Sequence, residues 1–471
     1  SHLEKASGIG LTFNQGVKAG SGNVTLSIAN AGVAGTVVEN FGVGNSVTYS
    51  NGDTITITPT ADLNQGQDYH LSYPSGAFTN IGGDVSYVGT AYTFQTKSYS
   101  YQLWGIGGRN NTGSLGQNNE VDYSSPTQIP GTTWSRLSYN HNGVIYSQGA
   151  IKSDGTLWTW GAQGTYSTLG HNQAAPVNIS SPTQVPGTNW ATVAASTDNM
   201  AFVKTDGTIW HTGRNTVAGS MGLNNILVNR SSPVQMGSDT DWDTGELKLY
   251  RGAEMCAAIK TNGTLYTWGD SFGGQLGHNQ QGSYPARLNS KSSPTQIPGT
   301  TWKYVTGAEY FCLATKTDGT LWAWGYNTYG RLAQNDGVNR SSPTQIPGTT
   351  WDWINAGDGN GGVSATKTDG TLWVWGRNNA YGQLGLNDTV TRSSPTQIPG
   401  TTWSRCMSAA PASTRALKTD GTLWAWGRNN YGQLGLNQAA ATLISSPTQI
   451  GSDTTWSTVG AAPGGFHIKR I

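Results

Sequence analysis

A nine-residue phrase, T-D-G-T-L-W-x-W-G, recurs along this chain and constrains its fold more than any other feature. It stands at residues 317–325, and edited copies occupy about four-fifths of the sequence. An Asp-Gly pair between alternating apolar runs supplies the positive φ that a two-residue turn requires. Each phrase therefore predicts two antiparallel strands joined by a tight hairpin.

The spacing of the phrase indicates a repeat architecture. Its final glycine, or the equivalent one, recurs every 51 to 56 residues. A strand-rich repeat of this length is typical of propeller blades and not of helical solenoid units. A Ser-Ser-Pro element also occurs seven times, each followed by a Trp such as Trp403, which predicts seven blades. The repeated glycines are Gly105, Gly161, Gly213, Gly269, Gly325, Gly376 and Gly427.

The hairpin turn is one short of this count. It appears six times, because no such turn precedes Trp104 in the first repeat or follows Phe466 in the last. The two halves of the missing hairpin therefore lie at opposite ends of the repeat region. If residues 466–471 pair with residues 101–105, seven blades close into a ring with no free sheet edge. We expect this closed seven-bladed propeller.

The side chains of each phrase suit sheets that pack on both faces. Successive strand residues point to opposite sides, so Trp322 and Trp324 share one face while Leu321 and Ala323 share the other. We expect most of the 19 Trp residues to belong to the core. Proline has no N–H to donate, so each Ser-Ser-Pro element is expected on an outer strand.

These repeats resemble regulator-of-chromosome-condensation-type (RCC1-like) repeats. The motifs that carry the resemblance are W-G-x-N-x-x-G-Q-L-G-L, most regular at residues 426–436, then S-S-P-T-Q-I-P and the alternating strand before T-D-G. The resemblance covers residues 99–471 and implies a seven-bladed propeller. It does not imply a function, because one fold serves many functions.

Residues 9–98 have few Trp and none of the repeated motifs. About seven short alternating runs, separated by Gly and Asn turns, predict a β-sandwich. The phrases L-T-F-x-x-x-V-K-A-G-S-G-N-V-T-L, T-I-T-P-T-A-D-L and G-A-F-T-N-I-G-G, in this order, resemble the bacterial Ig-like domain of S-layer, other surface and phage virion proteins. We therefore expect an all-β chain with an Ig-like β-sandwich at 9–98 and the propeller at 99–471. Residues 1–8 are expected to be a tag remnant or the cut end of a longer chain.

Composition narrows the possible partners. Charged residues make up 11% of the chain and the net charge is +1, so the clustered basic footprint of a nucleic-acid-binding protein is missing. No signal peptide or apolar run of membrane-spanning length is visible, so no membrane insertion is expected.

Cys256 and Cys312 occupy equivalent positions on neighbouring repeats, too far apart for a disulfide. With Cys406 they are expected to be small buried thiols.

No catalytic residues, metal site or cofactor motif stand out in the sequence. The seven His residues are scattered, without a Ser, Cys or carboxylate partner in a supporting motif. The repeated glycines lack the Lys of a phosphate-binding loop and are expected to form turns. His171 and His278 stand where other repeats have Leu386 and Leu436, which favours loop packing over metal binding.

The segments that differ most between repeats lie between the trailing Trp and the strand before the hairpin turn. By rotational equivalence these loops are expected to ring one face near the central channel, where varied polar and aromatic side chains build a recognition surface. Neutral drift explains the same variation equally well. The candidate ligand-binding residues of this variable ring are His141, Asn142, Asp198, Asn199, Arg251, Glu254, Glu309, Tyr310, Asp358, Asn360 and Arg415.

A second ring of candidate residues follows the W-G of each repeat. Tyr, Asn and Arg form good contacts with glycans and proteins. Their repetition also suits a structural role in which Asn caps turns. The members of this second ring are Arg109, Tyr166, Arg214, Phe272, Tyr329, Tyr381 and Tyr431.

The pattern as a whole favours a non-enzymatic binding protein on a virion or outside the cell, either a phage fibre component or a bacterial adhesin. Its expected partner is a host-surface glycan or protein, and the Ig-like domain is expected to act as a spacer that joins a larger assembly or a homo-oligomer. One alternative is a secreted, inhibitor-like propeller that binds a protein. Another is an exchange factor or an enzyme built on the propeller face.

Overall fold

The structure is a computed structural model. In it the chain forms two compact units, Ser1–Ser100 and Tyr101–Ile471. The described residues are 8–30, 33–60, 63, 67–96, 100–107, 110–138, 147–173, 177–216, 218–252, 254–282, 288–308, 310–357, 362–409, 412–438, 443–460 and 466–470. The side chains of residues 30, 408, 409 and 470 are not included.

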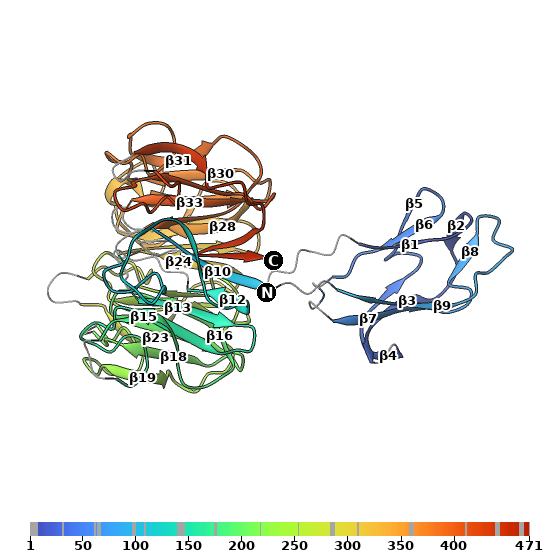
Figure 1. Ribbon diagram of the computed structural model, residues 1–471, viewed down its shortest axis with the longest axis horizontal. Helices are drawn as coiled ribbons and strands as arrows, with labels where there is room; N and C mark the ends of the chain where they lie inside the picture. Colours follow the sequence, from blue (N-terminus) through green and yellow to red (C-terminus); the bar gives the residue numbers. More distant parts are fainter. Residues whose placement is uncertain are drawn as a thin grey trace. The chain divides into compact units, whose positions relative to one another are not determined.

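The N-terminal unit consists of antiparallel strands (Figure 1). Their buried apolar side chains form one core. Alternation decides which side chains enter this core: in β7, Tyr69, Leu71 and Tyr73 are buried, while the residues between them are more exposed. The sheets have the orders β4-β3-β7-β9, β1-β6-β5 and β2-β8. The strands are β1 (Ile9–Thr12), β2 (Val17–Ala19), β3 (Asn23–Asn30), β4 (Val33–Gly42), β5 (Thr48–Ser50), β6 (Thr54–Ile57), β7 (Asp68–Tyr73), β8 (Phe78–Asn80) and β9 (Thr90–Gln95).

The larger unit contains seven four-stranded antiparallel sheets within its described residues. Six of them are built from consecutive strands, and the inner strands that begin consecutive sheets contact one another. In chain order these six sheets are β12 (Trp134–Leu137), β13 (Ser147–Lys152), β14 (Leu157–Gly161), β15 (Ile179–Gln184); β16 (Trp190–Ala195), β17 (Asn199–Lys204), β18 (Ile209–Gly213), β19 (Arg230–Gln235); β20 (Leu249–Arg251), β21 (Met255–Ile259), β22 (Leu265–Gly269), β23 (Lys291–Ile297); β24 (Trp302–Gly307), β25 (Phe311–Lys316), β26 (Leu321–Gly325), β27 (Arg340–Ile346); β28 (Trp351–Ala356), β29 (Gly362–Lys367), β30 (Leu372–Gly376), β31 (Arg392–Ile398); and β32 (Trp403–Ala409), β33 (Ser413–Lys418), β34 (Leu423–Gly427), β35 (Ile444–Gln449). A single 3-10 turn, η1 (Thr328–Gly330), is the one helical element among the described residues.

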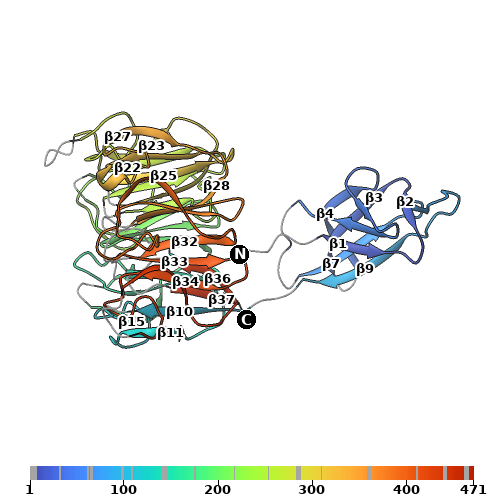
Figure 2. The same ribbon diagram turned by 90° about the horizontal axis from the view of Figure 1, so that it is seen from above.

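The seventh sheet combines strands from both ends of the larger unit. Its order is β11-β10-β37-β36, with β10 (Tyr101–Gly107), β11 (Tyr123–Ile129), β36 (Trp456–Gly460) and β37 (Phe466–Arg470). Tyr101 pairs with Arg470 and Gly105 with Phe466, so the first and last strands of the unit lie side by side (Figures 1 and 2). Inner strand β12 of the next sheet contacts both β10 and β37.

The strand register of this sheet corrects the predicted position of the repeated glycine in the first repeat. Leu103 pairs with Ile129 as Leu372 pairs with Ile398 in a later sheet. The equivalent of the repeated W-G glycine is therefore Gly107, with φ of +108°, and not the predicted Gly105. The prediction was wrong because Ile106 occupies the place that the second Trp takes in most other repeats. Trp104-Gly105 was therefore aligned with the Trp-Gly pair of those repeats, two residues before the true equivalent.

A main-chain hydrogen bond joins each sheet to the next. Its donor is an Asn in the loop before the outer strand, held at a φ of +52° to +59°, which Asn tolerates better than most residues. Its acceptor is the carbonyl oxygen of a Ser-Ser-Pro serine on the neighbouring outer strand. The seven bonds are Asn118 to Ser180, Asn172 to Ser231, Asn224 to Ser292, Asn279 to Ser341, Asn335 to Ser393, Asn387 to Ser445 and Asn437 to Ser124, at 2.7 to 3.0 Å.

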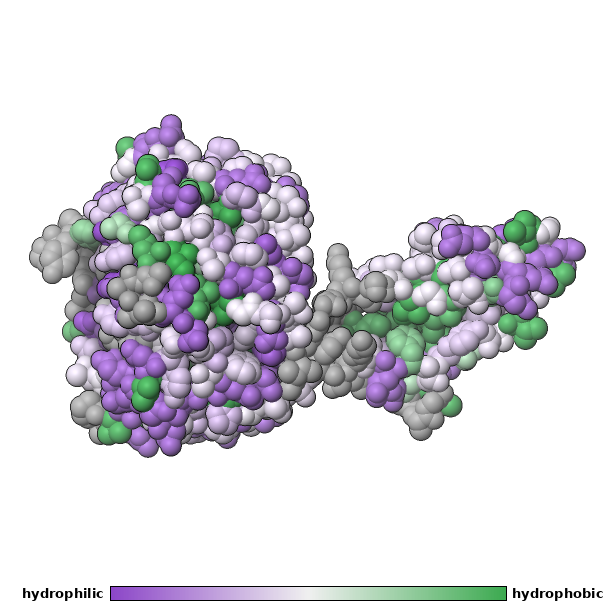
Figure 3. All heavy atoms as spheres, turned by 45° about the horizontal axis from the view of Figure 1, so that its top comes forward, coloured by the Kyte–Doolittle hydropathy of each residue, from purple (hydrophilic) through white to green (hydrophobic). Residues whose placement is uncertain are grey.

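Tryptophan and small aliphatic residues fill the space between the sheets. Trp160, Trp324, Trp375 and Trp426 are each at most 1% exposed, and their indole N–H groups donate to loop carbonyls of the preceding sheet. The Ser-Ser-Pro elements lie on outer strands, as predicted. On the face of the larger unit that Figure 3 shows, hydrophilic residues surround small hydrophobic patches. The described residues include no long apolar helix that could cross a membrane.

Candidate functional site

The antiparallel order of each sheet brings the two predicted rings to the same end. The loop after an inner strand and the loop after a third strand emerge on one side, which we call the loop end. The Asp-Gly hairpins emerge on the other side, the hairpin end. The N-terminal residue of the larger unit, Tyr101, begins the third strand β10 at the hairpin end.

Aromatic and arginine side chains from successive sheets pair at the loop end. The guanidinium of Arg214 lies 5.1 Å from the Tyr166 ring centre, that of Arg377 4.7 Å from Tyr329, and that of Arg428 4.8 Å from Tyr381. In each pair the Tyr belongs to one sheet and the Arg to the next. Cation–π contacts of this kind hold each half-buried Arg in a defined position. We call this set, together with Phe272 and Tyr431, the tyrosine–arginine ring.

Aromatic stacking replaces the Tyr–Arg pair between two of the sheets. Phe272 lies edge-on to Tyr310 at 5.8 Å, and Tyr310 lies edge-on to Tyr326 at 6.2 Å. Tyr310 was predicted in the variable ring and Phe272 in the second ring. Asp198 of the variable ring likewise forms a 3.4 Å ion pair with Arg214 of the second ring. The structure thus joins members of both rings in one surface.

Three variable-ring residues are buried. Asn199, Arg251 and Arg415 are 0% exposed, so they do not line the surface of the loop end, contrary to the prediction. Arg251 donates to the carbonyl oxygen of Met255 at 3.2 Å and to Ser220 Oγ at 3.1 Å, and Arg415 donates to the carbonyl oxygen of Gln433. The register of their strands turns these side chains into the interior.

The remaining predicted residues divide into two groups. Glu254 is half-buried in the loop between β20 and β21. Those that lie outside the described residues are Arg109, His141, Asn142, Glu309, Asp358 and Asn360.

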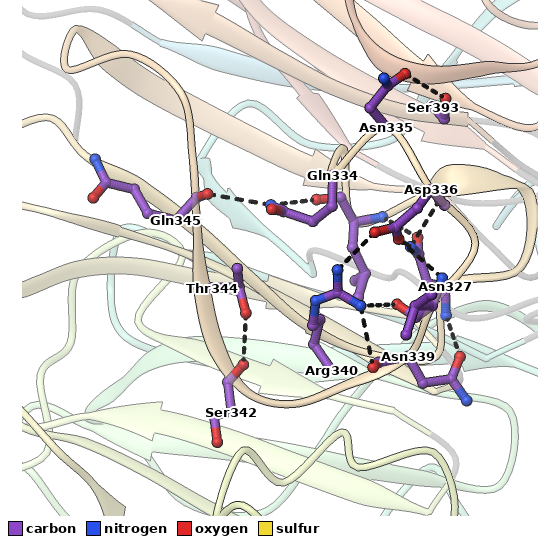
Figure 4. Close-up of polar contacts among 12 residues, drawn as sticks. Asn327, Gln334, Asn335, Asp336, Asn339, Arg340, Ser342, Thr344, Gln345 and Ser393 are labelled. Atoms are coloured by element: carbon purple, nitrogen blue, oxygen red, sulfur yellow. Dashed lines mark hydrogen bonds and ion pairs between the residues drawn. The ribbon is translucent and has the colours of Figure 1, made fainter.

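The asparagines of W-G-x-N have the predicted structural role. Asn327 Oδ1 accepts from the Leu332 N–H at 2.8 Å, and its Nδ2 donates to Asp336 (Figure 4). Asp336 in turn binds Arg340 at 2.7 Å. The equivalent Asn110 and Asn429 make the same bond to a loop N–H and are buried. These bonds make the loops rigid supports for the neighbouring aromatic side chains.

Burial lowers the pKa of four histidines of the larger unit. His211 and His467 are fully buried, and burial, followed by the charge of Arg251 and Arg415 respectively, holds the pKa of each well below its usual value. The Nε2 atom of His171 lies 2.8 Å from Thr159 Oγ1, and that of His278 lies 3.0 Å from Thr267 Oγ1, each within its own sheet, as expected for loop packing. No group of three or more metal-ligating side chains comes together within the described parts of the chain.

Comparison with known proteins assigns both units. Residues 102–468 match the family model of the RCC1-like domain, and residues 2–96 match that of the bacterial Ig-like domain. The chain belongs to the RCC1-like domain family. Among curated proteins, the ultraviolet-B receptor UVR8 of Arabidopsis thaliana is 29% identical over 70% of this chain and 74% of the receptor. The human E3 ubiquitin-protein ligase HERC2 is 24% identical over 66% of this chain, a match that spans 6% of the ligase.

Solved structures confirm the RCC1-like propeller fold. Yeast RCC1 (Prp20), solved bound to Kap60, superposes with a TM-score of 0.65 at 17% identity, over 79% of this chain and 89% of that protein. Human WBSCR16 gives 0.64 at 19% identity, over 80% and 99%. At these identities the likeness concerns the fold alone.

Grooves between neighbouring sheets of the RCC1-like propeller form a second kind of site. One groove of about 420 Å³ contains Trp302, Lys316 and Trp322 of one sheet and Asn279 of the sheet before it. These Trp residues were predicted to belong to the core, yet Trp322 is half-buried and its ring lies against the Lys316 ammonium. The sequence does carry a signal for this site, because a Lys stands two residues before the Asp-Gly or Asn-Gly of all six hairpin turns, in a chain with few charged residues.

One segment of the RCC1-like propeller lies among the inner strands. Residues 243–248 form an insertion before β20, and the carbonyl oxygen of Thr244 accepts from Arg136 at 2.8 Å and from Thr192 at 2.7 Å. Glu246 pairs with Arg405 at 3.3 Å, and the carbonyl oxygen of Leu247 accepts from the Val305 N–H at 2.7 Å. This bridging segment links the inner strands of four different sheets.

Proposed function

We propose that this chain is a non-enzymatic binding protein of a virion or bacterial surface, and that its loop end docks a host-surface glycan or protein. The observation that carries this proposal is the tyrosine–arginine ring. Tyr and Arg are enriched in recognition surfaces because they combine large contact area with polar groups. Stacking between sheets holds them in place before a ligand arrives, which lowers the entropic cost of binding.

We infer further that the seven sheets are the blades of one closed ring. The Asn–Ser hydrogen bonds support this, because the Asn437–Ser124 bond returns from the sixth sheet to the sheet that contains both ends. The pairing of β10 with β37 supports it as well. A closed ring has no free edge strand and keeps its loops still.

The N-terminal unit supports the proposed location. It matches the bacterial Ig-like domain, and the resemblance of its sequence to this domain was also the basis for expecting an extracellular or virion location. In this proposal it acts as a spacer that attaches the propeller to a larger surface or virion assembly, or to further copies of the chain.

A protein ligand is the second candidate, and a structural relative favours it. Prp20 was solved bound to Kap60, and a second Prp20p structure concerns its binding to Gsp1p and histones. A secreted, inhibitor-like propeller would use the same loop end. An exchange factor or an enzyme on this face is distinguished by turnover, which simple binding does not produce.

The test is a binding screen with the labelled full chain. It is applied to a glycan array, to a protein array and to intact cells before and after periodate or protease treatment. Saturable binding that periodate abolishes identifies a glycan, and binding that protease abolishes identifies a protein. Turnover of a bound polysaccharide or nucleotide would overturn the non-enzymatic assignment.

A further inference from the structure

We propose that the grooves between neighbouring sheets bind the carboxylate group of an acidic saccharide. These grooves are distinct from the tyrosine–arginine ring, so the proposal extends the proposed function to a second site. It rests on two equivalent grooves, on a lysine inside each, and on what the same lysine contacts elsewhere in this chain.

Each groove places an ammonium group between two Trp rings. In the larger groove, Lys316 Nζ lies 4.8 Å from the Trp302 ring centre and 4.5 Å from that of Trp322. In the other, of about 230 Å³, Lys152 Nζ lies 5.0 Å from Trp134 and 3.9 Å from Trp158. The stacking holds each charge in place without neutralising it.

In two sheets of this chain the equivalent lysine already holds a carboxylate. Lys260 Nζ lies 2.8 Å from Asp239 and 2.9 Å from Asp241, and Lys469 Nζ lies 2.7 Å from Asp453. Asp239 and Asp453 each stand three residues before the trailing Trp, in connectors that read G-S-D-T. The fold therefore accepts a carboxylate at this lysine.

The other five connectors read P-G-T and carry a glycine where those aspartates stand. A Cβ placed on Gly299 would lie 3.8 Å from Lys316 Nζ, so this part of the connector lies next to the ammonium. The hairpin carboxylate of Asp318 bonds instead to Thr320, at 2.7 and 2.9 Å. Among the described residues, no carboxylate lies within ion-pair distance of the five lysines, which are Lys152, Lys204, Lys316, Lys367 and Lys418.

The lining of the grooves favours a saccharide over an extended acidic peptide. A peptide that adds a strand needs free main-chain groups at a sheet edge. Here Pro343 has no N–H, and the carbonyl oxygen of Ser341 already accepts from Asn279 at 2.8 Å. The amides of Asn279 and Gln296 offer partners for sugar hydroxyls beside the Trp rings. Repetition of the lysine in five sheets suits a polysaccharide with one carboxylate per repeat, which gains avidity from several grooves.

The experiment measures binding of the full chain to acidic oligosaccharides by calorimetry. The probes are oligomers of galacturonate, of a glucuronate-containing glycan and of N-acetylneuraminate, each paired with its carboxyl-reduced form, and a polyglutamate peptide. We expect at least one acidic oligosaccharide to bind, and its reduced form to bind about tenfold or more weakly, because a charge-assisted bond is lost.

Four variants make the test specific. The double substitution Lys152→Met and Lys316→Met is expected to weaken binding, whereas Lys260→Met, which alters a lysine already paired with aspartate, is not. A chain in which residues 298–299 are replaced by the Gly-Ser-Asp of residues 451–453 keeps Lys316 but fills its groove, and should lose binding there. The Tyr329→Ala, Tyr381→Ala variant should retain it, which separates this proposal from the loop-end function. Failure of every acidic oligosaccharide, equal binding of the reduced forms, equal loss in Lys260→Met, or binding of polyglutamate alone would overturn the proposal.

Discussion

The main-chain N–H of Asn437 donates a 3.0 Å hydrogen bond to the carbonyl oxygen of Ser124, which belongs to the outer strand beside β10. The same bond links every other pair of consecutive sheets in the larger unit. The bond between Asn437 and Ser124 therefore joins the sheet β32–β35 to the sheet that contains the first and last strands of the larger unit. This relationship is the physical basis for a closed ring in our account.

Weakening β37 should destabilise the whole propeller. Ile468 is 2% exposed between β10 and β36, so Ile468→Ala leaves a cavity and is expected to cost about 2–5 kcal/mol of unfolding free energy. Val390, 57% exposed, is the matched control, and Val390→Ala should stay within about 0.5 kcal/mol. Guanidinium unfolding measures both. An unchanged midpoint for Ile468→Ala would argue against a structural role for the terminal pairing.

Local sequence patterns predicted most of the fold because they depend on neighbours in the chain. The hairpin at Asp318 and the outer position of Pro343 follow from turn chemistry and from a missing N–H. The first repeat was misaligned because Ile106 replaces a Trp, and only hydrogen-bond register identifies Gly107 as the equivalent glycine. In the N-terminal unit, most side chains of β4 are exposed, so this strand shows no apolar alternation that a sequence could reveal.

The candidate site was less predictable than the fold. Sequence variation located the loop end, but it does not reveal which way a side chain turns at a strand end. Arg251 and Arg415 turn inward and donate to main-chain carbonyl oxygens. The pairing of Tyr329 with Arg377 joins residues of different sheets, and the half-buried Trp322 looks like core in the sequence. These features depend on packing between sheets, which no local pattern encodes.

Acid should weaken the hairpin turns. In five of them the Asp carboxylate accepts from the side chain and N–H of the following Thr, and this holds its pKa below the usual 3.8. A carboxyl whose folded pKa is depressed stabilises the fold above its unfolded pKa, and this contribution is lost as pH falls through the lower folded value. The five are Asp154, Asp206, Asp318, Asp369 and Asp420.

The variant that replaces all five by Asn tests this. Asn262 already occupies the sixth turn and makes the same bonds to Thr264, at 3.1 and 2.7 Å, so the turns should survive. We expect the melting temperature of the wild type to fall below about pH 4 and that of the variant to fall less. Parallel profiles for the two proteins would refute the contribution of these carboxylates.

The bridging segment should stabilise the centre of the propeller. Glu246 and Arg405 are 16% and 12% exposed, so Glu246→Ala leaves a largely buried charge poorly compensated and should cost about 1–3 kcal/mol. The Lys303–Asp352 pair is 35% and 41% exposed, and Asp352→Ala should cost no more than about 1 kcal/mol. Chemical denaturation compares the two, with hydrogen exchange in the inner strands as a second reading. Equal costs would contradict the bridging role.

The three cysteines should be inert in the native protein. All are buried, and burial raises the pKa of Cys256 and of Cys406 to about 12 and that of Cys312 further. Because the thiolate is the reactive form, Ellman's reagent at pH 8 should label none of them in folded chains and all three after denaturation. Rapid labelling of a native thiol would show that its sheet opens.

The most direct test of the account compares ligand binding by the wild type with binding by the Tyr329→Ala, Tyr381→Ala variant. The readout is saturable binding of the labelled chain to the uncharged glycans of the array and to the protein array, because acidic glycans are expected to bind the grooves instead, with a thermal melt to establish folding. Tyr92→Ala, which removes a 47% exposed Tyr from the N-terminal unit, is the control. We expect the double variant to bind about tenfold or more weakly than the wild type, because truncation of the aromatic residues that anchor an interface removes much of its binding energy. The control should bind like the wild type. Unchanged binding by a folded double variant would contradict recognition through the loop end.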